Sequence, residues 1–302
     1  GGPKATTLEL AIYQAFRLEY NLGRAAVMAL LQLVLVLGAG VLALRLTAGA
    51  GFGSGLSRRG ARQHVSGPWL KVQDGLVLAL AAGFVGMPLL MVIWRGLLPI
   101  MSLPVSVWKA AGTSLILAFS STVLCLVAAF FLAASRRGCA ELTGLLGLAI
   151  SPLVLGTGWF ILINPFYNPT LFTLPVTVLV NALMALPFAL RVVAPEYARV
   201  ESAFGKVADG LGMHGLARFR LLHFPQMRAA FGFAAGLTAA LSMGDLGVIT
   251  LFANHEQATL PLQVYRLMGA YKMEAAAGAA LLLLGLSFAL FALFDWGGRR
   301  GS

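Results

Sequence analysis

Long runs of apolar residues, separated by short polar stretches, dominate the chain. Seven of these runs have the length of about 20 residues that a helix needs to cross a ~30 Å hydrocarbon core. Backbone polar groups in lipid must be hydrogen-bonded within their own segment, so each run predicts a membrane-spanning helix. The expected fold class is therefore an all-α polytopic membrane protein. The seven predicted spans are 25–44, 76–94, 114–134, 143–163, 172–190, 229–251 and 275–296.

The polar stretch from Pro195 to Pro225 interrupts this pattern. Pro195 suits the first turn of a helix, and Gly210 and Gly212 allow a sharp turn after it. Two rows of apolar residues at helical spacing lie before and after these glycines. We therefore expect two short helices joined at the glycines, with Pro225 ending the second. The first row is Tyr197, Val200, Phe204, Val207 and Leu211, and the second is Met213, Leu216, Phe219 and Leu222.

The composition indicates a membrane protein. Of the 302 residues, 59% are hydrophobic and 11% are charged, whereas soluble domains average about 45–50% and about 25%. The net charge of +11 does not predict a nucleic-acid partner, because the basic residues lie in loops between apolar runs. By the positive-inside rule, the more basic side is the cytoplasmic face of the membrane, which places the N-terminus outside and the C-terminus in the cytoplasm. Fifteen of the 22 Lys and Arg residues fall on that side, within 45–71, 136–137, 191–228 and 299–300.

Signatures of catalysis or cofactor binding do not occur in the sequence. Gly205 and Lys206 are followed by Val207, so the phosphate-binding pattern G-x-x-x-x-G-K-[ST] is not present and the chain is not expected to hold ATP. The four histidines share no metal-ligand spacing, and Cys125 and Cys139 show neither metal nor disulfide spacing. The chain is therefore not expected to be an enzyme or to carry a metal or a cofactor.

Asp245 lies deep in a predicted span. A carboxylate there is costly unless it is paired or faces water, which makes Asp245 a candidate for a substrate pathway. The alternative is that it lies near the outer end of its helix and is satisfied by Ser242 or a neighbouring loop. Asn181, Ser242 and Tyr265 are further candidates to line the pathway. A proton-coupled secondary carrier, with Asp245 as its proton relay, remains an alternative function.

Two distant segments of the chain are similar to each other. Residues 7–20 read TLELAIYQAFRLEY, residues 259–271 read TLPLQVYRLMGAY, and both lead into an apolar run. The shared Thr-Leu pair and the two tyrosines indicate a duplication. We expect 1–46 to be the tail of a first copy, 47–72 a Gly-rich basic cytoplasmic linker and 73–302 a complete second copy. Roughly 180 residues or more of the first copy are expected to precede Gly1.

The polar stretch resembles the cytoplasmic coupling motif of ABC importer permeases. That motif reads EAA, three residues, Gly, nine residues, Ile-x-Leu-Pro. The spacing from Gly to Pro matches here, whereas Lys206 replaces the Glu. The resemblance implies a six-helix type I importer permease domain (MetI-like) preceded by one further transmembrane helix, with a loop that docks on a separate ATPase. The corresponding positions are Lys206, Val207, Ala208, Gly212, Leu222, Phe224 and Pro225.

The likeness extends to duplicated permeases that import thiamine. It is carried by Asn181–Val192, Leu241–Phe252 and Ala258–Tyr265. It implies that thiamine or its phosphate esters arrive from a periplasmic binding protein, and that a cytoplasmic ATPase, expected to be a dimer, drives their transport. Duplicated iron(III) permeases are the alternative within the family. Because such permeases build their pathway between two copies, we expect 1–302 alone not to transport and the surface that holds Asn181 and Ser242 to face lipid.

Overall fold

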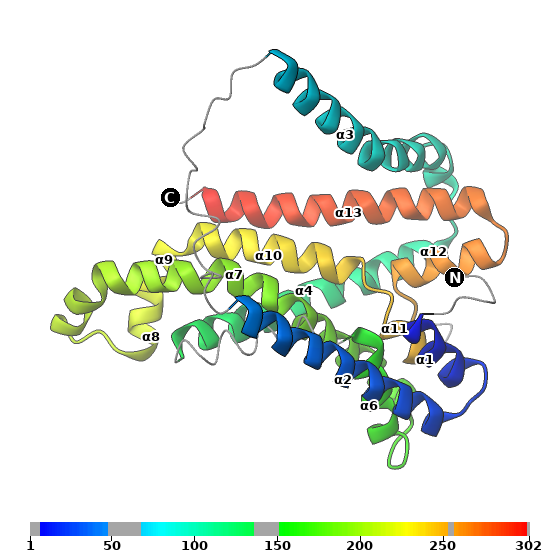
Figure 1. The fold of residues 1–302 in the computed structure, drawn as a ribbon, viewed down its shortest axis with the longest axis horizontal. Coiled ribbons are helices and arrows are strands. Elements are labelled where there is room, and N and C mark those ends of the chain that lie inside the picture. Colours follow the sequence, from blue (N-terminus) through cyan, green and yellow to red (C-terminus); the bar gives the residue numbers. More distant parts are fainter. Residues whose placement is uncertain (1–6, 48–67, 136–150, 253–256, 301–302) are drawn as a thin grey trace.

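The computed structural model describes residues 7–47, 68–135, 151–252 and 257–300, and every regular element in these ranges is a helix. Four long helices form the body of the molecule and run along a common direction (Figure 1). Of these, α4, α7 and α10 pack against one another, and α13 packs on α10. The predicted all-α polytopic class is confirmed. The four helices are α4 (Val105–Ala134), α7 (Thr173–Gly210), α10 (Arg228–Met243) and α13 (Met273–Arg299).

Shorter elements lie at the two ends of this body. One end, at the right of Figure 1, carries α1 (Leu8–Arg17) and α12 (Leu260–Gly269). The other end carries α8 (Gly215–Arg218), the π-turn η3 (Phe219–His223) and α9 (Phe224–Gln226). The remaining described elements are α2 (Leu22–Thr47), α3 (Pro68–Gly96), η1 (Pro99–Ser102), α6 (Pro152–Ile163), η2 (Pro169–Phe172) and α11 (Ile249–Phe252).

Among the described residues, five helices are long and apolar enough to cross a membrane. They correspond to five of the seven predicted spans. The predicted span 143–163 lies partly outside the described residues, and its described part contains the 12-residue helix α6. The five candidates are Leu22–Leu42, Lys71–Gly96, Val105–Ala134, Pro169–Gly210 and Met273–Arg299.

The prediction of one continuous helix over 229–251 is wrong. Helix α10 ends at Met243, and the chain turns before the short helix α11 begins. The turn is stabilised locally, because Asp245 Oδ1 accepts a hydrogen bond from the backbone N–H of Gly247 at 3.2 Å. Aspartate side chains favour such turns by bonding the backbone two residues ahead. Hydropathy alone did not reveal the turn, since the residues around Asp245 are apolar.

The prediction that a new helix starts at Pro195 is also wrong. Pro187 and Pro195 both lie inside α7, which continues for 38 residues to Gly210. Proline removes one backbone hydrogen bond from a helix, but in membrane helices neighbouring groups compensate the freed carbonyl. The first of the two expected short helices is therefore the end of a transmembrane helix.

The two similar segments of the sequence have the same local structure. Thr7 and Thr259 are the N-caps of α1 and α12, and each of these helices has ten residues. Tyr20 (φ 52°) and Tyr271 (φ 58°), which follow these helices, are the non-glycine residues with positive φ among those described. Each tyrosine precedes a long apolar helix, α2 or α13. Positive φ is uncommon outside glycine, so its occurrence at both tyrosines supports the proposed duplication.

Glycines bring α10 and α13 into close contact. A Cβ at Gly232 would lie 2.7 Å from Gly298 Cα and 2.7 Å from Phe294 O, so no larger residue fits there without movement. Such small residues allow close approach of membrane helices. Ala234 of α10 and Met227, the residue before α10, belong to a buried cluster with residues of α4 and α7.

Helices α1 and α2 pack on the body through α6. The ring of Phe16 in α1 meets the ring of Phe160 in α6 edge-on, with centroids 4.7 Å apart, and Phe160 contacts Phe252 at 5.5 Å. Phe16 and Phe252 belong to one buried cluster with Val176 of α7. The proposed boundary segment 47–72 lies mostly outside the described residues.

Helix α3 is the least covered of the long helices. It contacts η1 and the start of α13 near its own last residues and diverges from α13 toward its first residues (Figure 1). None of its most apolar 18-residue window is buried. Such an all-round apolar surface needs lipid or another protein around it.

Candidate coupling segment and buried polar network

The residues that resemble a coupling motif lie in the coupling segment, defined here as residues 195–226. Helix α7 would extend over about 57 Å at 1.5 Å per residue, nearly twice the ~30 Å core. The residues from Thr173 to Leu190 include no charged side chain. Charged residues begin at Arg191, so we place 191–210, and with them the coupling segment, outside the hydrocarbon core.

The turn after α7 depends on two glycines. Gly212 (φ 67°) and Gly215 (φ 56°) both adopt the left-handed region, which costs other residues about 1–2 kcal/mol. The expected turn at Gly212 is therefore present, and sequence reasoning missed the second position at Gly215. Nothing lies within 4 Å of a Cβ built on Gly212, so backbone conformation and not space requires glycine there.

The coupling segment has two limbs on either side of the turn. The first limb is the end of α7, from residue 195 to Gly210, and the second limb is one bent helical stretch of α8, η3 and α9. Pro225 lies in the first turn of α9 and does not end the limb, which continues to Gln226. A proline is tolerated in a first helical turn because that position needs no N–H donor. The chain then bends at Met227, a fully buried residue, and enters α10.

Apolar side chains of the segment project into solvent around the turn. Ala208, by contrast, is buried, and Lys206 is exposed. The motif residues are thus divided between a packed inner face and an exposed outer face. The exposed residues, called the outer row below, are Val207 (60% exposed), Leu211 (67%), Leu216 (80%), Leu221 (63%) and Phe224 (48%).

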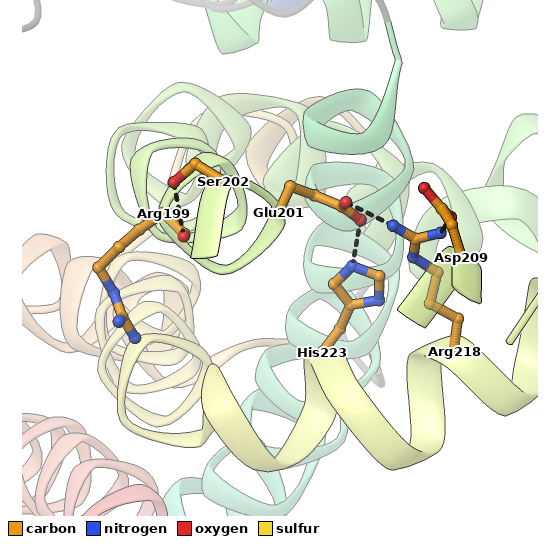
Figure 2. A network of polar contacts seen from close by, with 6 residues as sticks. All are labelled: Arg199, Glu201, Ser202, Asp209, Arg218 and His223. Carbon is orange, nitrogen blue, oxygen red and sulfur yellow. Dashed lines mark hydrogen bonds and ion pairs between the residues drawn. The ribbon is translucent and has the colours of Figure 1, made fainter. Parts of the chain in front are cut away.

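A charged network that sequence reasoning missed joins the two limbs (Figure 2). Glu201 Oε2 lies 2.6 Å from Arg218 Nη2, and Glu201 Oε1 lies 2.8 Å from His223 Nε2. Arg218 Nη1 also binds Asp209 Oδ1 at 2.5 Å. The His223 ring stacks on the ring of Tyr197, with centroids 4.9 Å apart and an angle of 12° between the planes.

The network sets the charge state of Glu201. Burial by itself would raise the pKa of this carboxyl, but hydrogen bonds from His223 and Arg218, with the positive charge of Arg218, lower it below its usual value. Burial, and then the negative charge of Glu201, raise the pKa of Tyr197. A carboxyl whose pKa is lowered by folding adds stability above its unfolded pKa and loses that contribution as the pH falls through the folded pKa. The Glu201 pairing is therefore fully formed at neutral pH.

Three of the four candidate pathway residues meet inside the helical body. Ser121 of α4 donates to Ser242 Oγ of α10 at 2.8 Å. In the amide orientation that satisfies its neighbours, Asn181 of α7 accepts from Ser242 Oγ at 2.9 Å and donates to Asp245 Oδ2 at 2.9 Å. These hydrogen bonds form a chain from α4 to the turn after α10.

The expectation that Asn181 and Ser242 face lipid is wrong, because they are only 4% and 7% exposed. Hydrogen bonding to one another removes the cost of placing them in an apolar environment. Tyr265, the fourth candidate, lies on α12, is 54% exposed, and belongs to an element that packs on α13 and α4.

Relatives of the chain are permeases of bacterial transport systems. It is 36% identical over 308 residues to the thiamine transport system permease protein ThiP of Brucella abortus (strain 2308). This alignment covers 98% of this chain and 56% of the relative. It is 34% identical over 310 residues to the protein of the same name from Escherichia coli (strain K12), with 98% and 58% covered. No protein-family model matches the chain.

A shorter match links the chain to a second kind of transport protein. It is 27% identical over 161 residues, 49% of the chain, to the sulfate transport system permease protein CysW of Synechococcus elongatus. The chain spans a little over half the length of the thiamine permeases that it matches. Its resemblance to thiamine permeases, indicated by the sequence motifs, is confirmed, and permeases are not themselves enzymes.

Proposed function

We propose that this chain, a homologue of the bacterial thiamine transport permeases, is the membrane-embedded permease part of an ABC importer for thiamine or its phosphate esters. A separate cytoplasmic ATPase drives transport, and a periplasmic binding protein delivers the substrate. The proposal rests on the match to thiamine permeases over 98% of the chain.

The observation that best supports coupling to an ATPase is the outer row of the coupling segment. Five apolar side chains, between 48% and 80% exposed, project from a protruding, internally braced structure. An amphipathic helix that docks in a groove presents such a row. Val207, Leu216 and Phe224 of this row would be buried in the ATPase, and the buried face around Ala208 and His223 would transmit movement to α7 and α10.

For the substrate, we propose that the chain from Ser121 to Asp245 lies beside the translocation pathway. Asp245 is the carboxylate in this network, and a negative charge suits a substrate with a cationic thiazolium ring. In the described conformation Asn181 and Ser242 are buried, so access to them requires α7 and α10 to separate. Tyr265, half exposed on α12, lies nearer the outer end and could contact the substrate on entry through its aromatic face.

Uptake of radiolabelled thiamine tests this function. The chain would be assembled with its ATPase, its binding protein and a second permease unit in membrane vesicles, with ATP supplied on the ATPase side. We expect ATP-dependent uptake that excess thiamine abolishes and that iron(III) leaves unchanged. Uptake driven by a proton gradient without ATP would instead favour the secondary carrier.

A further inference from the structure

Glu201 uses its two oxygens to hold two different parts of the second limb. Oε2 binds Arg218, the last residue of α8, and Oε1 binds His223, the last residue of the π-turn. Arg218 in turn reaches Asp209 near the end of α7. One side chain of α7 thereby fixes the limb that follows the Gly212 turn at two points (Figure 2).

The π-turn explains how both partners reach the same carboxylate. In a regular α-helix, residues five apart point in directions about 140° different. Here the backbone N–H of Phe224 bonds Phe219 O, five residues earlier, which widens the turn by one residue. A wider turn brings residues five apart closer to one face, so that Arg218 and His223 both face Glu201.

His223 is held in the orientation that the contact needs. Its side chain is 4% exposed, stacks on Tyr197 and meets the Phe130 ring edge-on, with centroids 5.6 Å apart. Its Nδ1 has no hydrogen-bond partner among the described residues. An ionised carboxylate only accepts hydrogen bonds, so the ring nitrogen that faces Glu201, Nε2, carries the proton and donates it to Oε1.

Space for the Glu201 side chain is provided by Gly205, one helical turn later. A Cβ at Gly205 would lie 2.7 Å from Glu201 Oε2 and 3.4 Å from Arg218 Nη2. Gly205 is buried inside α7, where alanine would otherwise be the better helix former by about 1 kcal/mol. The carboxylate and the guanidinium thus occupy the position that a larger side chain would fill.

We propose that Glu201 is a positioning residue for coupling: it fixes the angle of the second limb on α7, so that a force on the outer row moves α7 and not the limb alone. This inference rests on the proposed function. Glu201 also gives the coupling segment an acidic group at a different position from the Glu of the family motif, which is replaced by Lys206 in this chain. Gly205, Arg218 and His223 act through Glu201.

Two matched glycine variants test the clamp directly. Gly205→Ala displaces the Glu201 side chain, whereas Gly210→Ala adds the same methyl group to the same helix with nothing within 4 Å. Hydrogen exchange of the amides from Phe219 to Met227 would be measured on the whole chain in lipid nanodiscs. We expect exchange about tenfold faster in G205A, the equivalent of losing one charge-assisted hydrogen bond, and no change in G210A. Equal exchange in the two variants would overturn the clamp.

The ratio of thiamine molecules transported to ATP molecules hydrolysed then distinguishes a positioning role of Glu201 from a role in the stability of the segment alone. In the assembled transporter we expect G205A and His223→Phe to lower this ratio severalfold while ATP hydrolysis continues. H223F keeps an aromatic ring against Tyr197 but removes the donor to Glu201. Glu201→Ala should also lower the ratio, and Glu201→Gln, which retains an acceptor oxygen, should restore part of that loss. Faster exchange with an unchanged ratio would overturn the positioning role. If wild-type vesicles showed no ATP-driven uptake, the proposed function would fail and the positioning role with it, even where G205A and G210A differed in exchange.

Discussion

At the scale of single residues, the coupling segment contains two glycines where a side chain would have different effects. At Gly212 a side chain would strain the positive-φ backbone, whereas at Gly205, which is helical, it would displace the Glu201 carboxylate. Two glycines seven residues apart therefore have different physical roles. The expected effects of substituting them differ accordingly.

Gly212→Val should uncouple ATP hydrolysis from transport while the protein remains inserted. A β-branched residue at φ 67° is strained by about 1–2 kcal/mol or more, so the turn would relax and the outer row would be displaced. Gly210→Val, in helical backbone with open space, is the control and should couple normally. The measurement is thiamine uptake and ATP hydrolysis in the same vesicles. Normal uptake by G212V would show that the turn is not needed for coupling.

Asp245→Asn should lower thiamine uptake more than it lowers the amount of inserted protein. Asparagine keeps an oxygen for the Gly247 N–H, so the expected loss of stability is about 1 kcal/mol, while the negative charge beside the proposed pathway is removed. Thr122→Ala, which removes a buried hydroxyl of α4 that bonds Ala118 O and is outside this network, is the control. Uptake would be divided by inserted protein for each variant. Equal losses of both quantities in D245N would make Asp245 a structural residue.

At the scale of elements, apolar length predicted where membrane helices exist but not how they end. The composition of 172–190 predicted a span, yet α7 continues past Pro195 because tertiary contacts outweigh the local preference of proline. Helix α10 ends at Met243, and the turn after it, which an Asp245 hydrogen bond stabilises, lies within a run that still reads as apolar. The Glu201 network was not predictable, since its partners lie 17 and 22 residues away and meet only through a π-turn. The glycines did predict the turn at Gly212. The apolar row before it was predicted as one face, whereas Val200 is buried and Val207 and Leu211 are exposed.

Packing of α10 on α13 should be sensitive to one methyl group. Gly232→Ala places a Cβ 2.7 Å from backbone atoms of α13, which cannot move as a flexible side chain would. We expect a loss of about 1–3 kcal/mol in the free energy of unfolding. Gly285→Ala on α13, with nothing within 4 Å, should be neutral or slightly stabilising. Thermal unfolding in detergent measures both, and equal midpoints would mean that the two helices separate without cost.

At the scale of the whole molecule, the described connections between helices lie at two opposite ends of the helical body. The coupling segment lies at one end of the body, and α1, α12 and the Tyr271 turn lie at the other (Figure 1). The positive-inside rule makes the first end cytoplasmic. A cysteine at Leu216, which is 80% exposed, should therefore be labelled from the cytoplasmic side, and one at Tyr271, 87% exposed, from the periplasmic side. Labelling of both from the same side of sealed vesicles would contradict this orientation.

Transport itself should require a second permease unit beside this one. Helix α3 has no buried residue in its apolar window, and only 11% of the window in α2 is buried, so two long helices leave most of their surface for lipid or for another subunit. The segment α1–Tyr20–α2 repeats the structure of α12–Tyr271–α13, but it packs on α6, whereas α12 and α13 pack on α4 and α10. We propose that α1 and α2 belong to the other unit of a two-unit permease and contact this one across their interface.

Residues 1–302, produced with only the ATPase and the binding protein, should then insert into the membrane without supporting thiamine uptake. Uptake should return when a first unit, such as the unmatched part of a thiamine permease relative, is supplied as a separate chain. Robust uptake without it would contradict the requirement, unless cysteine cross-linking between copies showed that two of these chains had assembled with each other.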